Sequence, residues 1–199
     1  MATASDARAW AHSALKGIGD SLYTPFCGVD GDDIDWDAYR RLVRYCVGDL
    51  GHPMLWVTSG VAEFWSLTIT ERKRLLEIAI EEARAINPDV VVQSCTAALS
   101  AKDCLVLTRH AQEAGADIVY IQTPMMELHA GDCVLKFFRY ISDRTEHRAG
   151  DVQFAVLGIR AECRGERAHR RRSRPCARRR RAHSGHRTVA YCTTWHRSW

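Results

Sequence analysis

Short apolar runs alternate along this chain with longer segments in which apolar residues recur every three or four positions. A short apolar run between turn residues is typical of a buried strand, whereas the longer spacing is typical of a helix with one buried side. The pattern predicts four strands, at residues 17–24, 54–57, 90–92 and 118–121.

Capping residues mark where the helices between these strands begin and end. Asp35 and Ser100 are N-cap residue types, and Thr68 with Glu71 has the spacing of a capping box. Gly115 is a natural helix stop, because glycine accepts the left-handed conformation that ends many helices. We therefore expect helices after Asp35, Thr68 and Ser100, and a fourth over about residues 131–140.

This order gives four β/α units of roughly thirty residues each and predicts a parallel sheet with right-handed crossovers. An open doubly wound sheet and a (β/α)8 barrel both use such units. The chain has no Gly-x-Gly-x-x-Gly after its first predicted strand and no Walker loop, which argues against the nucleotide-binding version. With four units alone, the first and fourth strands would form two unpaired edges.

The charge pattern changes abruptly at Thr145. Residues 1–145 hold 14 basic and 20 acidic residues, whereas residues 146–199 hold 14 arginines, no lysine and only 4 acidic residues. We therefore divide the chain into an N-terminal extension (1–14), a β/α region (15–145) and an arginine-rich, disordered or irregular tail (146–199).

The eight cysteines include no Cys-x-x-Cys pair, and no apolar run approaches the length of a membrane span. Free cysteines in apolar contexts fit a reducing compartment. We expect a cytoplasmic protein with no metal site and no cofactor.

Several local motifs in the β/α region occur together, in order and in register. They are Thr24-Pro25-Phe26, Asp30-Gly31, Ile34-Asp35, Ser59-Gly60-Val61-Ala62-Glu63, Leu67-Thr68, Glu71-Arg72, Ala114-Gly115-Ala116-Asp117 and Thr123-Pro124. Over about residues 15–145 the chain thereby resembles the dihydrodipicolinate synthase / N-acetylneuraminate lyase family. The second group falls where that family carries Gly-Thr-Thr-Gly-Glu.

The resemblance implies the N-terminal half of a (β/α)8 TIM barrel. Members of this family are commonly homotetramers that act on pyruvate or a related 2-keto acid, by aldol cleavage or condensation or by dehydration. They form a Schiff base with a lysine on the sixth strand, and the iminium then stabilises a carbanion or enamine. Barrel enzymes place such sites at the C-terminal ends of the strands.

The resemblance also assigns candidate site residues. Thr24, Ser59, Gly60 and Val61 would form a cradle for the substrate carboxylate, and Ser59 and Gly60 could equally form a plain turn. Other positions line a pocket or have a structural role: Glu63, Thr123 and Met125. Glu63 could simply bind backbone amides, and Thr24 and Thr123 could cap strand ends.

The chain departs from the family at positions that carry its chemistry. Gly60 and Val61 replace the two signature threonines, and Met125-Met126 replaces an aromatic pair, so neither place offers a hydroxyl for proton transfer. These changes argue against lysine biosynthesis. The run Glu63-Phe64-Trp65-Ser66-Leu67 is similar to the Glu-Phe-Phe-Ser-Leu run of the sugar-acid dehydratase branch.

No lysine of this chain is placed to form a Schiff base. Lys73, Lys102 and Lys136 fall on predicted helices, and Lys16 precedes the first strand. We therefore expect a truncated, inactive member of the family. The alternative is a basic-tailed nucleic-acid-binding protein, because arginine clusters such as those at 170–172 and 178–181 bind phosphate. Nonspecific binding of polyanions by the tail is a further possibility.

We attribute the change at Thr145 to a frameshift. Where the family has a strand ending in Tyr-Asn-x-Pro, a one-base shift with ordinary codons permits a matching segment that contains Asn, Ser and Pro. Out-of-frame GC-rich codons also yield arginine without lysine. The shifted frame does not restore the Schiff-base lysine.

The nucleotide sequence across codons 140–150 tests this hypothesis. We expect a discontinuity there, beyond which the shifted frame encodes the family's fifth strand. A continuous frame whose related genes encode the same arginine-rich tail would disprove the frameshift.

Overall fold

The computed structural model describes residues 4–123, 131–145, 153–157 and 191–192. Its main sheet has six strands in the spatial order β1-β4-β5-β6-β7-β8, and all neighbours are parallel except β7 and β8. The strands of this sheet are β1 (Gly19–Ser21), β4 (Met54–Val57), β5 (Val91–Cys95), β6 (Ile118–Gln122), β7 (Gln153–Leu157) and β8 (Tyr191–Cys192). A short antiparallel hairpin, β2 (Phe26–Cys27) with β3 (Asp33–Ile34), follows β1.

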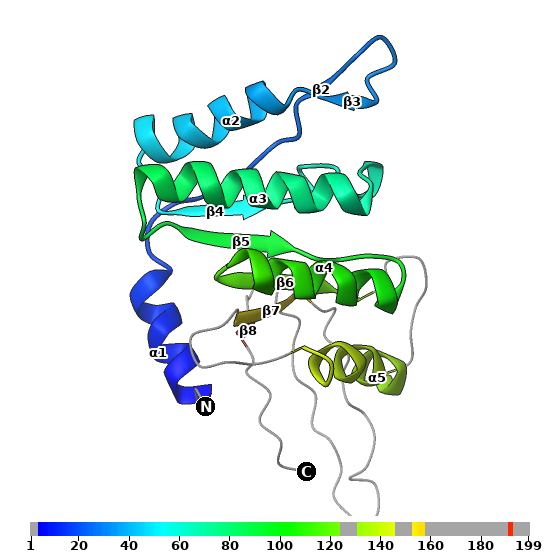
Figure 1. The fold of residues 1–199 in the computed structure, drawn as a ribbon. Coiled ribbons are helices and arrows are strands. Elements are labelled where there is room, and N and C mark those ends of the chain that lie inside the picture. Colours follow the sequence, from blue (N-terminus) through cyan, green and yellow to red (C-terminus); the bar gives the residue numbers. More distant parts are fainter. Residues whose placement is uncertain (1–3, 124–130, 146–152, 158–190, 193–199) are drawn as a thin grey trace, which may run out of the picture.

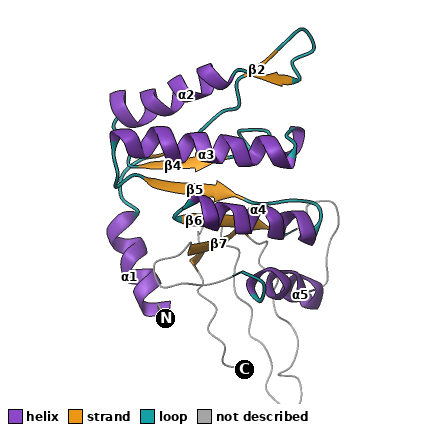
Figure 2. Ribbon diagram, in the orientation of Figure 1, coloured by secondary structure: helices purple, strands orange, loops and turns teal. Residues whose placement is uncertain are grey.

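Helices connect successive parallel strands and lie side by side along the sheet (Figure 1). Figure 2 shows the same alternation of strands and helices along the described chain. The helices are α1 (Ala4–Ala14), α2 (Trp36–Arg44) continued by a π-helical turn η1 (Tyr45–Asp49), the 3-10 turn η2 (Phe64–Ser66), α3 (Ile69–Ile86), α4 (Ala101–Ala114) and α5 (Gly131–Ser142). This is the α/β architecture of part of a (β/α)8 barrel, as the sequence predicts.

The predicted helix boundaries are confirmed by their capping hydrogen bonds. Asp35 and Ser100 accept bonds from the amides of Ala38 and Asp103, and Thr68 with Glu71 forms the reciprocal capping box. Gly115 ends α4 with φ 87°, a left-handed conformation that side-chain-bearing residues rarely adopt.

The motif that contains Gly115 also fixes the start of the next strand. The carboxylate of Asp117 accepts a 2.8 Å hydrogen bond from the amide of Val92, and Arg84 donates to the carbonyl of Gly115. Helix α3 and strand β5 are thereby tied to the entry of β6.

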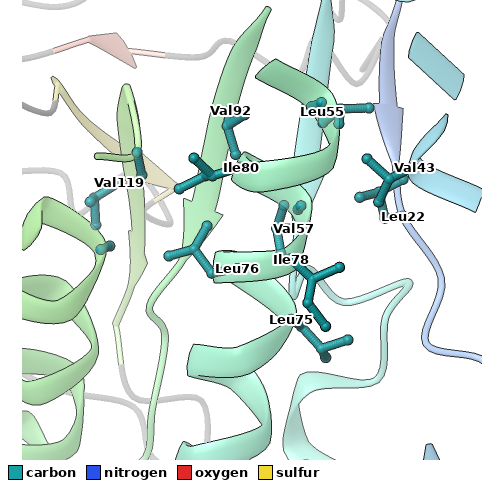
Figure 3. Packing of buried hydrophobic residues seen from close by; sticks show 14 of the residues in the cluster. Leu22, Val43, Leu55, Val57, Leu75, Leu76, Ile78, Ile80, Val92 and Val119 are labelled. Atoms are coloured by element: carbon teal, nitrogen blue, oxygen red, sulfur yellow. The ribbon is translucent and has the colours of Figure 1, made fainter. Parts of the chain in front are cut away.

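The main hydrophobic core lies between the sheet and the helices (Figure 3). Alternate strand residues point into it, among them Leu55, Val57, Val92 and Val119, and α3 covers them with Leu75, Leu76, Ile78 and Ile80. Since successive side chains of a strand alternate between its faces, the residues between these belong to the opposite, inner face of the sheet.

The structure differs from the predictions for the edge of the sheet and for the tail. We expected β6 to form an open edge, but it pairs with β7 over five residue pairs, so that prediction is wrong. We also expected no strand in the tail, yet β7 and β8 lie within it. The run at 153–157 is apolar except for its first residue, and its strand character was obscured by the arginine content of the segment as a whole.

The rest of the predicted tail, including both arginine clusters, lies outside the described residues.

Helix α1 occupies most of the N-terminal extension, where a high alanine content favours a helix. Within the described part of the chain, no helix is long and apolar enough to cross a membrane.

A buried carboxylate joins α2 to α3 on the outer layer. Glu82 accepts hydrogen bonds from Arg44 Nε at 2.6 Å and Arg40 Nη1 at 2.5 Å, and its side chain is only 9% exposed. These bonds hold the pKa of Glu82 below its ordinary value of 4.5, with Arg44 contributing most.

We predict that Glu82→Gln lowers the free energy of unfolding by about 1–3 kcal/mol, the usual range for hydrogen bonds to a charged group. A depressed carboxyl pKa stabilises the fold above pH 4.5, and this contribution is lost as the pH falls through the lower, folded-state value. Urea unfolding should therefore show a difference between variant and wild type that shrinks in acid. Glu81→Gln is the matched control, because its side chain is 65% exposed; an equal loss there would contradict the assignment.

Candidate active site at the C-terminal ends of the strands

The turn that follows β4 lies at the centre of the predicted carboxylate cradle. The amide of Ala62 donates to the carbonyl of Ser59, and the amide of Glu63 donates to that of Gly60, so residues 59–63 form two consecutive tight turns. Among the described residues, the amides of Gly60 and Val61 have no hydrogen-bond acceptor. Two neighbouring unpaired amides in a turn are suited to an anion.

Residues that follow or belong to β1 fix this turn in place. Thr24 Oγ1 donates to the carbonyl of Ala62 at 2.8 Å, and the hydroxyls of Ser21 and Ser59 are hydrogen bonded at 2.5 Å. Thr24 and Ser59 are buried, whereas Gly60 and Val61 are exposed. The structure therefore brings together all four residues predicted for the carboxylate cradle.

Two residues of this loop have left-handed backbone conformations. Thr58 has φ 52° and Glu63 has φ 53°, values that cost a side-chain-bearing residue about 1–2 kcal/mol each. Thr58 is buried and donates to the carbonyl of Cys95 at 3.0 Å, which offsets part of that cost. Glu63 is exposed and makes no capping bond to η2, so its carboxylate is open to solvent.

Of the remaining predicted pocket residues, Thr123 does not join this turn. Thr123 directly follows β6, which is separated from β4 by β5, and it is partly buried. Met125 lies outside the described residues. The four lysines also lie away from the turn, since Lys73, Lys102 and Lys136 belong to the helices and Lys16 precedes β1.

The inner face of the sheet carries a second cluster directly beside the candidate site. Its buried members are Phe64, Cys95, Ala97 and Tyr120, and Trp56 packs against them. We call these five residues the inner-face cluster. Trp56 and Tyr120 meet edge to face, with ring centroids 5.0 Å apart.

Arg72 extends from α3 to the edge of the inner-face cluster. Its guanidinium donates to the carbonyls of Cys95 and Ala97, both at 2.8 Å, and lies 5.0 Å above the ring of Phe64. No carboxylate pairs with it among the described residues, and burial lowers the pKa of its guanidinium. Arginine nevertheless stays charged at neutral pH, so this is a buried positive charge over Phe64, the residue that follows the turn.

The two titratable groups of the inner-face cluster, Cys95 and Tyr120, are uncharged at neutral pH. Burial raises the pKa of the Cys95 thiol, so it stays protonated and is a poor nucleophile. Burial likewise raises the pKa of Tyr120, whose hydroxyl accepts a hydrogen bond from Gln122 at 3.0 Å. In the described chain, no group of three or more His, Cys, Asp or Glu side chains is placed to hold a metal ion. The arrangement can bind an anion and donate hydrogen bonds, but it offers no activated nucleophile.

Ser21, Trp56, Arg72 and Gln122 were not identified as site residues from the sequence. Arg72 belongs to the Glu71-Arg72 motif, but the motif does not tell which backbone atoms the side chain meets. Ser21 and Trp56 are partners in the register of β1 and β4, which only the folded sheet defines.

Comparison with known proteins agrees with this geometry. The model of the dihydrodipicolinate synthetase family matches residues 14–148. The chain belongs to this family. A 4-hydroxy-tetrahydrodipicolinate synthase from Thermotoga neapolitana is 33% identical over 132 residues, which cover 66% of this chain and 42% of that protein.

Solved structures of the dihydrodipicolinate synthetase family and of related lyases share the fold. Dihydrodipicolinate synthase from Bacillus clausii superposes with a TM-score of 0.62 and 26% identity, covering 72% of this chain and 45% of that one. N-acetylneuraminate lyase from Mycoplasma synoviae gives a TM-score of 0.64 at 19% identity, covering 72% and 46%. A prophage protein of the family from E. coli K12, solved in complex with pyruvate, gives 0.60 at 24% identity. The chain thus spans less than half the length of these relatives.

Replacing Arg72 tests its part in holding the strand end. We predict that Arg72→Met lowers the free energy of unfolding by about 2–4 kcal/mol, because the buried carbonyl of Ala97 loses its side-chain donor and that of Cys95 loses one of two. Arg74→Met is the control: this arginine is half-exposed and, among the described residues, pairs with Glu77 alone, so its loss should change stability by less than about 0.5 kcal/mol. Chemical denaturation would compare the two variants, and equal midpoints would contradict the proposed tie.

Proposed function

We propose that this chain carries the carboxylate-binding part of a lyase site that acts on pyruvate or a related 2-keto acid. The reaction class is aldol cleavage or condensation, or dehydration, through a Schiff base. The observation that carries the proposal is the turn at residues 59–63, in which the amides of Gly60 and Val61 have no acceptor among the described residues. The buried guanidinium of Arg72 lies over Phe64, the residue that follows this turn. An E. coli relative with the same fold was solved with pyruvate bound, which supports the choice of ligand.

The amides of Gly60 and Val61 would hold the carboxylate of the 2-keto acid. They are fixed before the ligand arrives, because Thr24 already donates to the carbonyl of Ala62 and Ser21 is hydrogen bonded to the hydroxyl of Ser59. Such preorganised donors bind negative charge without the cost of reordering the loop. Arg72, whose guanidinium lies over Phe64 immediately after the turn, adds a positive field, since a buried charge is poorly screened by water.

We further propose that this chain does not form the Schiff base itself. A lysine that attacks a keto carbon must lose its proton near neutral pH, which requires burial or a neighbouring positive charge. Lys16, Lys102 and Lys136 are exposed, and Lys73 lies on α3, on the outer layer of the fold. The chain would therefore bind the 2-keto acid without bonding to it covalently.

Ligand-observed NMR with pyruvate tests the binding proposal. We expect weak, saturable binding that Val61→Thr strengthens about fivefold to tenfold, because the added hydroxyl supplies one more hydrogen bond. Val61→Ala is the matched control and should leave the affinity unchanged. Absence of pyruvate binding in all three proteins would contradict the proposed function.

The same samples, treated with borohydride, test the absence of a Schiff base. We expect no gain of mass on the protein, since borohydride traps only an iminium. A pyruvate-dependent covalent adduct would show that one of the four lysines is reactive after all.

A further inference from the structure

The hydroxyl pair of Ser21 and Ser59 holds one proton for which the described residues offer no acceptor. Each serine hydroxyl can donate one hydrogen bond and accept two. The two oxygens lie 2.5 Å apart, and among the described residues neither hydroxyl has another partner. A single hydrogen bond joins them, so one of the two hydroxyl protons is shared between them and the other is left without an acceptor.

Burial assigns the free proton to Ser21. Ser59 is only 2% exposed, so water cannot accept its proton, and Ser21 Oγ is its one acceptor among the described residues. An unpaired buried donor is costly, and buried hydroxyls are therefore nearly always paired. Ser59 thus donates to Ser21. Because Ser21 is only partly buried, its own proton can be donated to water or to a ligand.

Strand register places Ser21 on the inner face of the sheet. Ser21 pairs with Trp56, which packs against the inner-face cluster, whereas the preceding residue, Asp20, pairs with Leu55 of the main core. Ser21 is also the last residue of β1, and barrel enzymes bind their ligands at the C-terminal ends of the strands. The indole N–H of Trp56 can only donate, so this neighbour cannot accept the free proton.

The free hydroxyl of Ser21 lies within reach of a ligand held at the turn of residues 59–63, which we call the carboxylate turn. Ser59 Oγ and the amide nitrogen of Gly60 belong to successive residues and are at most about 5 Å apart. Ser21 Oγ, 2.5 Å from Ser59 Oγ, therefore lies within about 8 Å of that nitrogen. Two hydrogen bonds of about 3 Å each, with the carboxylate and keto groups of one 2-keto acid between them, span this distance.

We propose that Ser21 donates its free proton to the keto oxygen of the 2-keto acid whose carboxylate lies at the carboxylate turn. The amides of Gly60 and Val61 would already supply two donors to the carboxylate, so the keto oxygen is the next acceptor along the ligand. Ser59 is a positioning residue, because its hydrogen bond to Ser21 directs the Ser21 proton elsewhere and polarises that hydroxyl. This inference rests on the proposed function and adds the residue that recognises the keto group.

Pyruvate and propionate separate this inference from the proposed function itself. Both anions carry the carboxylate, but propionate has a methylene group where pyruvate has its keto group. Binding of propionate therefore reports on the carboxylate turn alone. In ligand-observed NMR we expect the full chain to bind pyruvate about threefold to tenfold more tightly than propionate, as one additional hydrogen bond would give.

Ser21→Thr and Ser21→Val form a matched pair, because the new side chains have nearly the same shape and only threonine carries a hydroxyl. Ser21→Thr should keep the preference for pyruvate and Ser21→Val should abolish it, with propionate affinity within about twofold of wild type in both. Ser21→Ala tests the same loss with a smaller side chain, so the proposal can be judged even if circular dichroism shows that a branched variant is unfolded. Ser66→Ala is the control: it removes an exposed hydroxyl from η2, just after the turn, and should preserve the preference.

Three results would overturn the inference while leaving the proposed function in place. Equal affinity of the wild-type chain for the two anions would mean that no group recognises the keto oxygen. An equal loss of pyruvate and propionate affinity in Ser21→Val and Ser21→Ala would mean that Ser21 only holds the turn or binds the carboxylate. A full preference for pyruvate in both variants would assign the keto oxygen to another residue. If neither anion binds the wild-type chain, the proposed function fails together with the inference built on it.

Discussion

Helix α3 packs its apolar side on β4 and β5, and the position of every functional group near the site depends on that contact. Leu75, Leu76 and Ile78 are almost completely buried against Leu55 and Val57. Burial of a side chain of this size contributes about 1.5–3 kcal/mol, so this contact supplies a large share of the stability of a small sheet. It also fixes the rotation of α3 about its axis, and this rotation directs Arg72 towards the end of β5.

Much of the described fold follows from local sequence signals. The caps at Asp35, Thr68 and Ser100 each combine a residue type with a hydrogen bond that needs no distant partner, so the sequence predicts them well. The parallel sheet follows from the alternation of strands and helices in the same way. The hairpin of β2 and β3 was not foreseen, because strands of two residues are too short to show any alternation.

Strand β7 was not predicted from the sequence either, for a different reason. Four of its five residues are apolar, as is typical of a buried strand. They follow the change to an arginine-rich composition, however, and that composition predicts an irregular segment. Pairing with β6 then decides their conformation, and that partner is about thirty residues away in the chain. The composition of a short segment does not predict that it will pair with a strand so distant in the chain.

Only those residues of the candidate site that belong to recognisable sequence motifs could be predicted. Thr24 and Ser59 both lie at the turn, because both follow strands that are neighbours in the sheet. Trp56, Tyr120 and Gln122 come together only through strand register, which places alternate residues of three strands on one face. A tryptophan and a glutamine in two separate apolar runs look like ordinary strand residues until that register is known.

The hydrogen bonds of Arg72 and those of Glu82 respond differently to acid. Glu82 holds α2 to α3 through its ionised carboxylate, so protonation weakens that contact. Arg72 binds backbone carbonyls, which do not titrate, and its own charge persists at every pH that the fold would meet. Acid should therefore loosen the outer helical layer first and leave the strand ends beside the carboxylate turn in place, so that unfolding in acid proceeds from the outside of the barrel segment towards its inner face.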